Sequence, residues 1–130
     1  MADDPPDAVV AVVDDDQRIL DSLQTLLESA GYDVRLFTSA TALLETGRLE
    51  EIECVISDIN MPEIDGLELS RRLHAARPGL PIILITGHPE LLNRSRLVVG
   101  TSHYQLFTKP YDPEELIAAI GDMVRKHSPR

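Results

Sequence analysis

The sequence predicts an α/β protein with a doubly wound, five-stranded parallel sheet and five helices. Short apolar, β-branched segments alternate with longer segments whose apolar residues recur at helical spacing. Strands that alternate with helices are joined by right-handed crossovers, which place helices on both faces of a parallel sheet. A chain of 130 residues suits one compact domain. We therefore expect that domain at residues 8–126, a disordered tail at 1–7 and a short C-terminal tail at 127–130.

The predicted strands are the short segments that are richest in apolar, β-branched residues. They are Ala8–Val13, Val34–Phe37, Cys54–Ser57, Ile82–Thr86 and Gln105–Thr108.

The first and last helices have the clearest boundaries in the sequence. An apolar stripe follows the first strand, and Gly31 then provides the left-handed residue that ends a helix. The last helix begins with Asp112 as its N-cap, followed by Pro113 and by Glu115 at the third position. Between the fourth and fifth strands the composition predicts a fourth helix that is short, irregular or mobile.

Composition and charge exclude several classes of function. Lys and Arg number 12 against 22 Asp and Glu, which gives a net charge of −10. A chain this acidic is not expected to bind nucleic acid or an anionic membrane by itself, because both require basic patches. The single cysteine, Cys54, rules out an internal disulfide. No apolar run approaches the roughly 20 residues of a membrane span, and the acidic start does not resemble a signal peptide, so we expect a cytoplasmic protein.

Polar residues with related chemistry follow four of the five predicted strands. Acidic residues follow the first strand at Asp14 and Asp15 and the third at Asp58, while Thr86 ends the fourth strand and Lys109 follows the fifth. Since the carboxyl ends of parallel strands meet at one edge of the sheet, we expect these side chains to lie close together.

Crowded carboxylates repel one another unless a cation compensates their charge. An all-oxygen site favours Mg²⁺, with Mn²⁺ as an alternative, and such a site serves phosphate chemistry. A carboxylate such as Asp58 can attack a phosphoryl group and hold it as an acyl phosphate. Lys109 and the hydroxyl of Thr86 then supply a charge and a hydrogen bond to its oxygens.

Four motifs together resemble the receiver domain of two-component response regulators. They occur in the order and at the spacing typical of that family, over nearly the whole chain. The motifs are Val12-Val13-Asp14-Asp15-Asp16, Ser57-Asp58-Ile59-Asn60-Met61-Pro62-Glu63-Ile64-Asp65-Gly66-Leu67, Ile85-Thr86-Gly87 and Thr108-Lys109-Pro110-Tyr111. The resemblance implies a flavodoxin-like sheet with strand order 2-1-3-4-5.

The resemblance also assigns roles around a Mg²⁺ ion. Asp58 matches the phospho-acceptor, and Asp15 matches the carboxylate that binds the metal directly. Asp14 matches the acid that acts mainly through water, and Asn60 matches the position whose backbone carbonyl binds the metal. Mn²⁺ is a possible substitute.

Two further positions match the groups that read the phosphorylation, and a third departs from the pattern. Thr86 matches the switch hydroxyl, and Lys109 matches the lysine that pairs with the phosphoryl group. Three residues before that lysine the family usually carries Tyr or Phe, whereas this chain has Leu106, flanked by Tyr104 and Phe107. We expect either aromatic neighbour to take over the switching role.

The function that this reading predicts is that of a switch, not an enzyme with turnover. A sensor histidine kinase or a phosphotransfer protein would phosphorylate Asp58, and an unknown downstream protein would read the changed surface. A stand-alone receiver is preferred over a fragment of a longer regulator, as a monomer or a phosphorylation-dependent homodimer.

Two alternatives remain open at this stage. One is a haloacid-dehalogenase-like phosphatase that uses Asp14 and Asp16, although no hydroxyl residue follows that pair closely and Asp58 would be left unexplained. The other is a degenerate receiver that docks a partner without phosphorylation, which Leu106 favours and the complete set of acids, threonine and lysine disfavours.

Overall fold

The structure is a computed structural model, and it describes residues 8–91 and 104–126. The predicted tails at 1–7 and 127–130 lie outside this range. The described elements, in chain order, are β1 (Val9–Val13), α1 (Gln17–Ser29), β2 (Asp33–Phe37), α2 (Ala40–Thr46), the 3₁₀ turn η1 (Leu49–Glu51), β3 (Cys54–Asp58), α3 (Gly66–Ala76), β4 (Ile82–Thr86), the 3₁₀ turn η2 (Pro89–Leu91), β5 (Tyr104–Thr108) and α4 (Pro113–Lys126).

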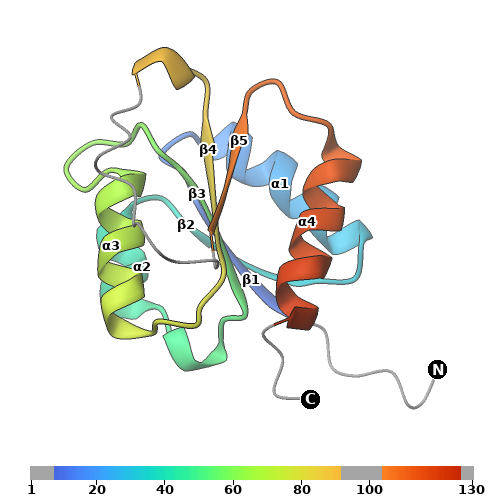
Figure 1. The fold of residues 1–130 in the computed structure, drawn as a ribbon, viewed down its shortest axis with the longest axis horizontal. Coiled ribbons are helices and arrows are strands. Elements are labelled where there is room, and N and C mark those ends of the chain that lie inside the picture. Colours follow the sequence, from blue (N-terminus) through green and yellow to red (C-terminus); the bar gives the residue numbers. More distant parts are fainter. Residues whose placement is uncertain (1–7, 92–103, 127–130) are drawn as a thin grey trace.

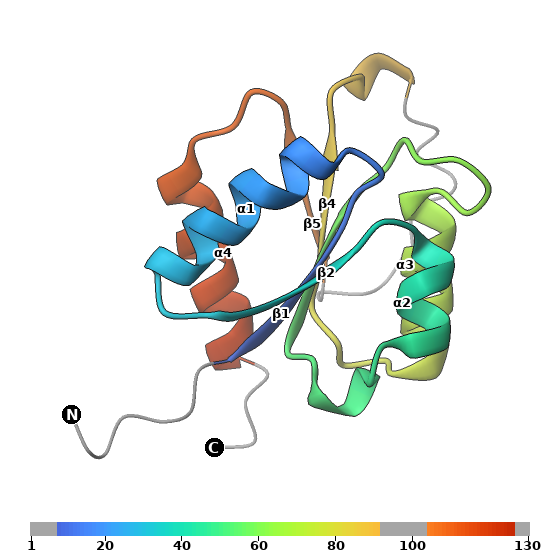
Figure 2. The same ribbon diagram turned by 180° about the vertical axis from the view of Figure 1, so that it is seen from behind.

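The strands form one parallel sheet in the order β2-β1-β3-β4-β5, which confirms the predicted fold class and strand order. Helices α1 and α4 cover one face of the sheet, and α2 and α3 cover the other (Figure 1; Figure 2). Because the strands are parallel, all their carboxyl ends lie at one edge, at the top of Figure 1.

The predicted boundaries differ from the observed ones by a residue or so. Strand β1 begins after Ala8, while β2, β3 and β5 also include Asp33, Asp58 and Tyr104. The predicted fourth helix falls largely on residues 92–103, outside the described residues, and the described part of the same connection contains η2. In the described residues no helix combines the length and apolar character needed to cross a membrane.

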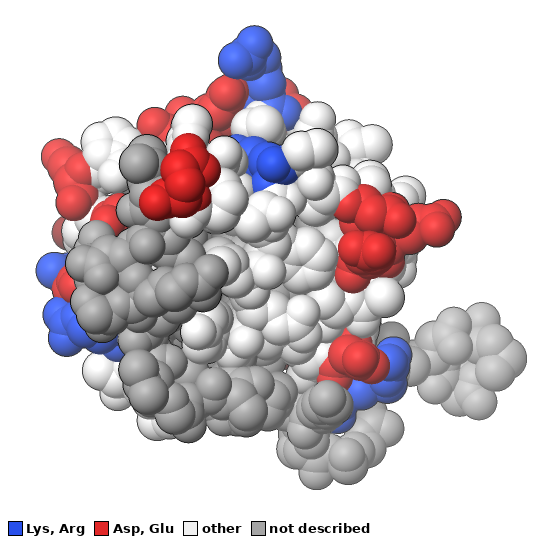
Figure 3. Space-filling view, turned by 45° about the horizontal axis from the view of Figure 1, so that its top comes forward, with Lys and Arg blue, Asp and Glu red and all other residues white. Residues whose placement is uncertain are grey.

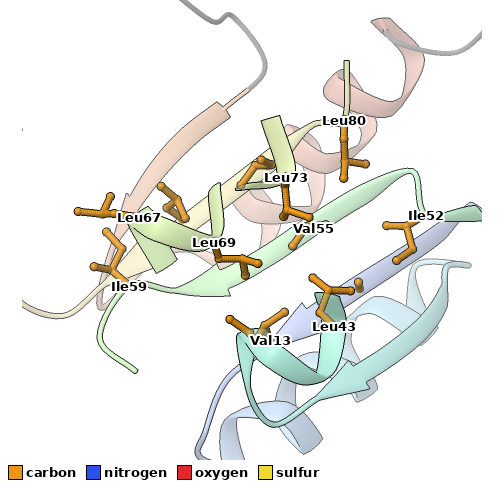
Figure 4. Close-up of a cluster of buried hydrophobic side chains, with 13 residues drawn as sticks. Val13, Leu43, Ile52, Val55, Ile59, Leu67, Leu69, Leu73 and Leu80 are labelled. Carbon is orange, nitrogen blue, oxygen red and sulfur yellow. The ribbon is translucent and has the colours of Figure 1, made fainter. Parts of the chain in front are cut away.

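The core has two halves, one on each face of the sheet. Alternate strand residues point to opposite faces, so neighbours such as Cys54 and Val55 belong to different halves. The half beneath α2 and α3 is drawn in Figure 4, where Leu69 and Leu73 of α3 lie over Val13 and Val55 of the sheet. This burial fixes α3 on the sheet, and its first residue, Gly66, packs against the backbone of Asp58 at the carboxyl end of β3.

The predicted caps of the first and last helices are confirmed. The side chain of Asp16 accepts a hydrogen bond from the amide of Arg18 and caps α1, and Gly31 follows that helix with a φ of 95°. The side chain of Asp112 accepts from the amide of Glu114 at 2.9 Å, which caps α4. These caps set the points at which the chain leaves and enters the loops around the strand ends.

Candidate functional site

Asp14 is fixed by the backbone at the end of β1. Its amide donates to the carbonyl of Phe37 at 3.1 Å, and one of its carboxylate oxygens accepts from the amide of Asp16 at 2.9 Å. Its side chain is buried, with 4% of the residue exposed. Asp15, the next residue, is exposed. The turn after β1 therefore presents one buried and one accessible carboxylate.

The structure brings three of the predicted acids together. Asp14, Asp15 and Asp58 each offer a carboxylate oxygen, and these atoms lie within 4.8 Å of one another. Asp58 reaches this group as the last residue of β3, which pairs with β1 in the sheet. Three hard oxygen donors in one cluster suit Mg²⁺ or Mn²⁺ better than Zn²⁺, which favours nitrogen and sulfur.

Two of these acids, Asp14 and Asp58, have raised pKa values, and burial is the largest cause for both. The pKa of Asp14 is raised to about 6, mainly by burial and also by the charges of Asp58 and Asp15, while the Asp16 amide and Lys109 oppose the change. Burial also raises the pKa of Asp58, against the opposing charge of Lys109 and the amides of Asn60 and Ile59. A divalent cation would offset both the loss of hydration and the mutual repulsion of the carboxylates, because it supplies positive charge where water has been excluded.

Lys109 provides the positive charge of the cluster. Its ammonium nitrogen lies 4.0 Å from a carboxylate oxygen of Asp58. The Lys109 amide donates to the carbonyl of Thr86 at 2.8 Å, which holds the end of β5 beside the end of β4. The Lys109–Pro110 peptide bond that follows is cis.

Thr86 lies at the carboxyl end of β4, with 1% of the residue exposed. Its hydroxyl oxygen accepts a hydrogen bond from the amide of His88 at 3.0 Å. The hydroxyl hydrogen remains available as a donor, because a hydroxyl can donate and accept at once. The register pairs Asp58 with Ile85, so Thr86 is one residue beyond the position opposite Asp58.

The loop from Asp58 into α3 contains a contact that sequence reasoning did not identify. Asn60 is exposed, and a role for its carbonyl as a metal ligand stays a prediction. Gly66, however, packs against the backbone of Asp58, and a Cβ at this position would lie 2.4 Å from the Asp58 carbonyl oxygen. The signal available in the sequence was the pair Asp65-Gly66, an N-cap followed by a glycine at the start of a helix.

The aromatic residues near the usual switch position lie on opposite faces of the sheet. Leu106 and Tyr104 pack against the half of the core under α2 and α3. Phe107 packs on the other face, where its ring meets that of Tyr111 edge to face at 6.3 Å. Of the two aromatic neighbours of Leu106, Tyr104 therefore shares its face and Phe107 does not.

Figure 3 views the molecule with the carboxyl ends of the strands turned toward the reader. Acidic side chains form several separate groups there, and a few basic side chains lie among them. An excess of acidic groups lowers the local potential and attracts cations.

Fold and site together define a doubly wound α/β protein with a cluster of three acids at the carboxyl edge of its sheet, in a geometry that could hold a metal ion. The family model for the response regulator receiver domain matches residues 10–121, so the chain belongs to this family. It is a receiver domain of the two-component response regulators.

Individual relatives agree with this assignment. The transcriptional regulatory protein FixJ of Bradyrhizobium diazoefficiens is 36% identical over 121 residues, which cover 92% of this chain and 58% of FixJ. The response regulator protein TmoT of Ectopseudomonas mendocina is 37% identical over 115 residues, covering 88% of this chain and 51% of TmoT. A CheY-like receiver domain protein from Methanospirillum hungatei has a crystal structure that superposes with a TM-score of 0.79 at 31% identity, covering 93% of this chain and 96% of that one.

The matched chain thus spans little more than half the length of these curated relatives, whereas it spans almost all of the CheY-like structure.

Proposed function

We propose that this receiver domain is switched by phosphorylation of Asp58. The observation that carries the proposal is the set of charges around that carboxylate: two other acids within 4.8 Å and the Lys109 ammonium at 4.0 Å. The Asp58 side chain is 12% exposed, so it is partly shielded from water and still accessible to a phosphoryl donor.

In the proposed reaction, a carboxylate oxygen of Asp58 forms a bond to the phosphorus of the donor. The bond from phosphorus to the donor breaks, and the donor leaves with that electron pair and takes up a proton from water. Lys109 lies close enough to pair with an equatorial phosphoryl oxygen. The hydroxyl of Thr86 retains a hydrogen that can be donated to another.

We assign the metal site to Asp14, Asp15 and Asp58, with the carbonyl of Asn60 as a further ligand. The fit rests on the oxygen donors and on the raised pKa of Asp14, which is caused mainly by burial and also by the charges of Asp58 and Asp15. A bound Mg²⁺ would offset negative charge on the phosphoryl oxygens. Mn²⁺ has the same preference for oxygen ligands.

The proposal extends to the partners and the location of the domain. A sensor histidine kinase or a phosphotransfer protein supplies the phosphoryl group, and a downstream protein reads the new charge at Asp58. The charge acts on the residues packed around it, as in other switches that bias a two-state element. We place this relay in the cytoplasm and assign the domain a signalling role without turnover of a substrate.

Intact-mass spectrometry with a small-molecule phosphodonor and Mg²⁺ tests the proposal. The wild type should gain the mass of one phosphoryl group, and Asp58→Ala should gain none. Equal gain by Asp58→Ala, or no gain by the wild type, would contradict the assignment.

The metal assignment has a separate test. Asp15→Asn should weaken Mg²⁺ binding by at least about tenfold, because it removes one charge from the cluster. Asp33→Asn removes a charge from an exposed residue of β2 and serves as the matched control. Isothermal titration with Mg²⁺ alone measures both variants, and equal affinity of Asp15→Asn and wild type would remove Asp15 from the ligand set.

A further inference from the structure

Gly66, the first residue of α3, lies directly against the backbone of the acceptor. Its amide donates to the carbonyl of Ile59 at 2.9 Å, and the residue is buried. A Cβ built on Gly66 would lie 2.4 Å from the carbonyl oxygen of Asp58 and 2.8 Å from the Cα of Ile59. Both neighbours are backbone atoms, so a side-chain rotation cannot relieve the contact.

Space alone explains the glycine at this position. Among the described residues, a positive φ occurs at Gly31 and at Glu63, and not at Gly66. An alanine could therefore adopt the backbone conformation of Gly66 without strain. The obstacle to any larger residue is the Asp58–Ile59 backbone.

Both sides of this contact are held in place. Helix α3 is fixed along its length by the buried side chains Leu67, Leu69 and Leu73. The acceptor side is a strand end, where the Ile59 amide donates to the carbonyl of Ile85 at 2.9 Å. A new atom at Gly66 cannot be accommodated without a backbone shift, and we expect that shift to reach Asp58, whose carbonyl oxygen is the nearest atom.

We propose that Gly66 is a positioning residue for the phosphorylation of Asp58, an inference that rests on the function proposed above. By lacking a side chain, Gly66 allows α3 to pack against the acceptor backbone. That contact fixes the Asp58 carboxylate relative to Lys109 and to the acids that follow β1.

The size of the effect follows from the contact distance. To reach a tolerable contact, the atoms must separate from 2.4 Å to at least 3.0 Å. A misplacement of about 1 Å in a reacting group can lower a rate by about 100-fold. We therefore expect Gly66→Ala to slow phosphorylation by at least about tenfold.

Two other glycines provide matched controls. A Cβ at Gly47 would lie 2.6 Å from both the Cδ1 and the carbonyl oxygen of Leu43, so the space around Gly47 is about as crowded as that around Gly66. Gly47 ends α2 before β3 begins, so it lies at the opposite edge of the sheet from Asp58. A Cβ at Gly79 would meet nothing within 4 Å.

The experiment measures the initial rate of phosphoryl gain and the stability of all three alanine variants. Gly66→Ala should be phosphorylated slowly. Gly47→Ala should be less stable than wild type and still be phosphorylated within about twofold of the wild-type rate. Gly79→Ala should match wild type in both respects. If folded Gly66→Ala reacts within about twofold of wild type, Gly66 does not position the acceptor.

Two additions keep the proposal testable if the single variant fails to fold or if the wild type gains no phosphoryl group. Gly66→Ala is also prepared with Gly121→Ala, a substitution in α4 where the new Cβ meets side-chain ends and no backbone. Compared with the wild-type crystal structure, that of the double variant should show the Asp58 carboxylate shifted relative to Lys109 by more than about 0.5 Å, which is the positional tolerance of a functional site. Movement of α3 with Asp58 left in place would overturn the proposal, whatever the phosphorylation result.

Discussion

Replacing Asp14 with asparagine should make the metal-free protein more stable, although it removes a residue of the proposed site. The pKa of Asp14 is about 6 in the folded protein, against 3.8 for an unperturbed carboxyl group. Each pKa unit corresponds to about 1.4 kcal/mol, so the ionised Asp14 costs the folded state up to about 3 kcal/mol near pH 7.5.

The pH dependence fixes the sign of the effect. Because the pKa is higher in the folded state, the folded protein binds the proton more tightly, and this stabilisation is lost as the pH rises through about 6. Asp14→Asn cannot ionise, so it avoids this loss of stability at high pH, and its carboxamide oxygen can still accept the hydrogen bond from the Asp16 amide. Burying the carboxamide has a desolvation cost of its own. The ionisation cost is about 3 kcal/mol at pH 7.5 and about 1 kcal/mol at pH 4.5, whereas a carboxamide desolvation cost of about 1 kcal/mol does not change with pH. We therefore expect a net gain of about 2 kcal/mol at pH 7.5 that falls to about zero at pH 4.5.

Urea denaturation followed by circular dichroism, with EDTA present, measures this difference. Asp33→Asn, at an exposed position of β2, is the control and should change the free energy of unfolding by less than about 0.5 kcal/mol. Saturating Mg²⁺ should stabilise the wild type more than Asp14→Asn. A variant that is no more stable than wild type at pH 7.5, or a gain that is the same at both pH values, would refute the reasoning.

Two further substitutions test other parts of the structure. Lys109→Ala removes the positive charge that opposes the raised pKa of Asp58, and it should slow phosphoryl gain by at least about tenfold. Arg125→Ala, at an exposed position, is the control. A rate for Lys109→Ala within about twofold of wild type would exclude the role of Lys109. Gly121→Ala should stabilise α4 by about 0.5 to 1 kcal/mol, because alanine favours the helix over glycine. The added Cβ would lie 3.2 Å from the flexible guanidinium end of Arg125, which can move aside, and 3.7 Å from the hydroxyl of Tyr32. Thermal unfolding measures this change, and a loss of stability would show that the Tyr32 packing requires glycine.

Much of the fold could be predicted because the strands are short, apolar and separated by helices with clear boundaries. Val10 and Val12 point to one face of the sheet and Ala11 and Val13 to the other, so β1 is apolar along its whole length. Because the carboxyl ends of parallel strands share one edge of the sheet, the polar residues after the strands were expected there, and the structure brings Asp14 and Asp58 together at that edge. These features depend on local pattern and on the geometry of parallel sheets, both of which the sequence records.

Other features depend on contacts between distant segments and could not be predicted from spacing. The approach of Gly66 to the Asp58 backbone depends on the angle at which α3 meets the sheet. The pKa of Asp14 depends on how completely the surrounding loops exclude water. Spacing also could not show that Tyr104 packs on the same face of the sheet as Leu106.

Chemical trapping of the phosphorylated residue tests most directly whether Asp58 is the acceptor. Borohydride reduces an acyl phosphate to the alcohol, so a phosphorylated aspartate becomes homoserine and can be located by peptide mass spectrometry. After incubation with phosphodonor and Mg²⁺, we predict homoserine at position 58 and intact aspartate at positions 14 and 15. Homoserine at either of those neighbours, or a phosphoryl gain with no reduced residue at position 58, would contradict the proposed function.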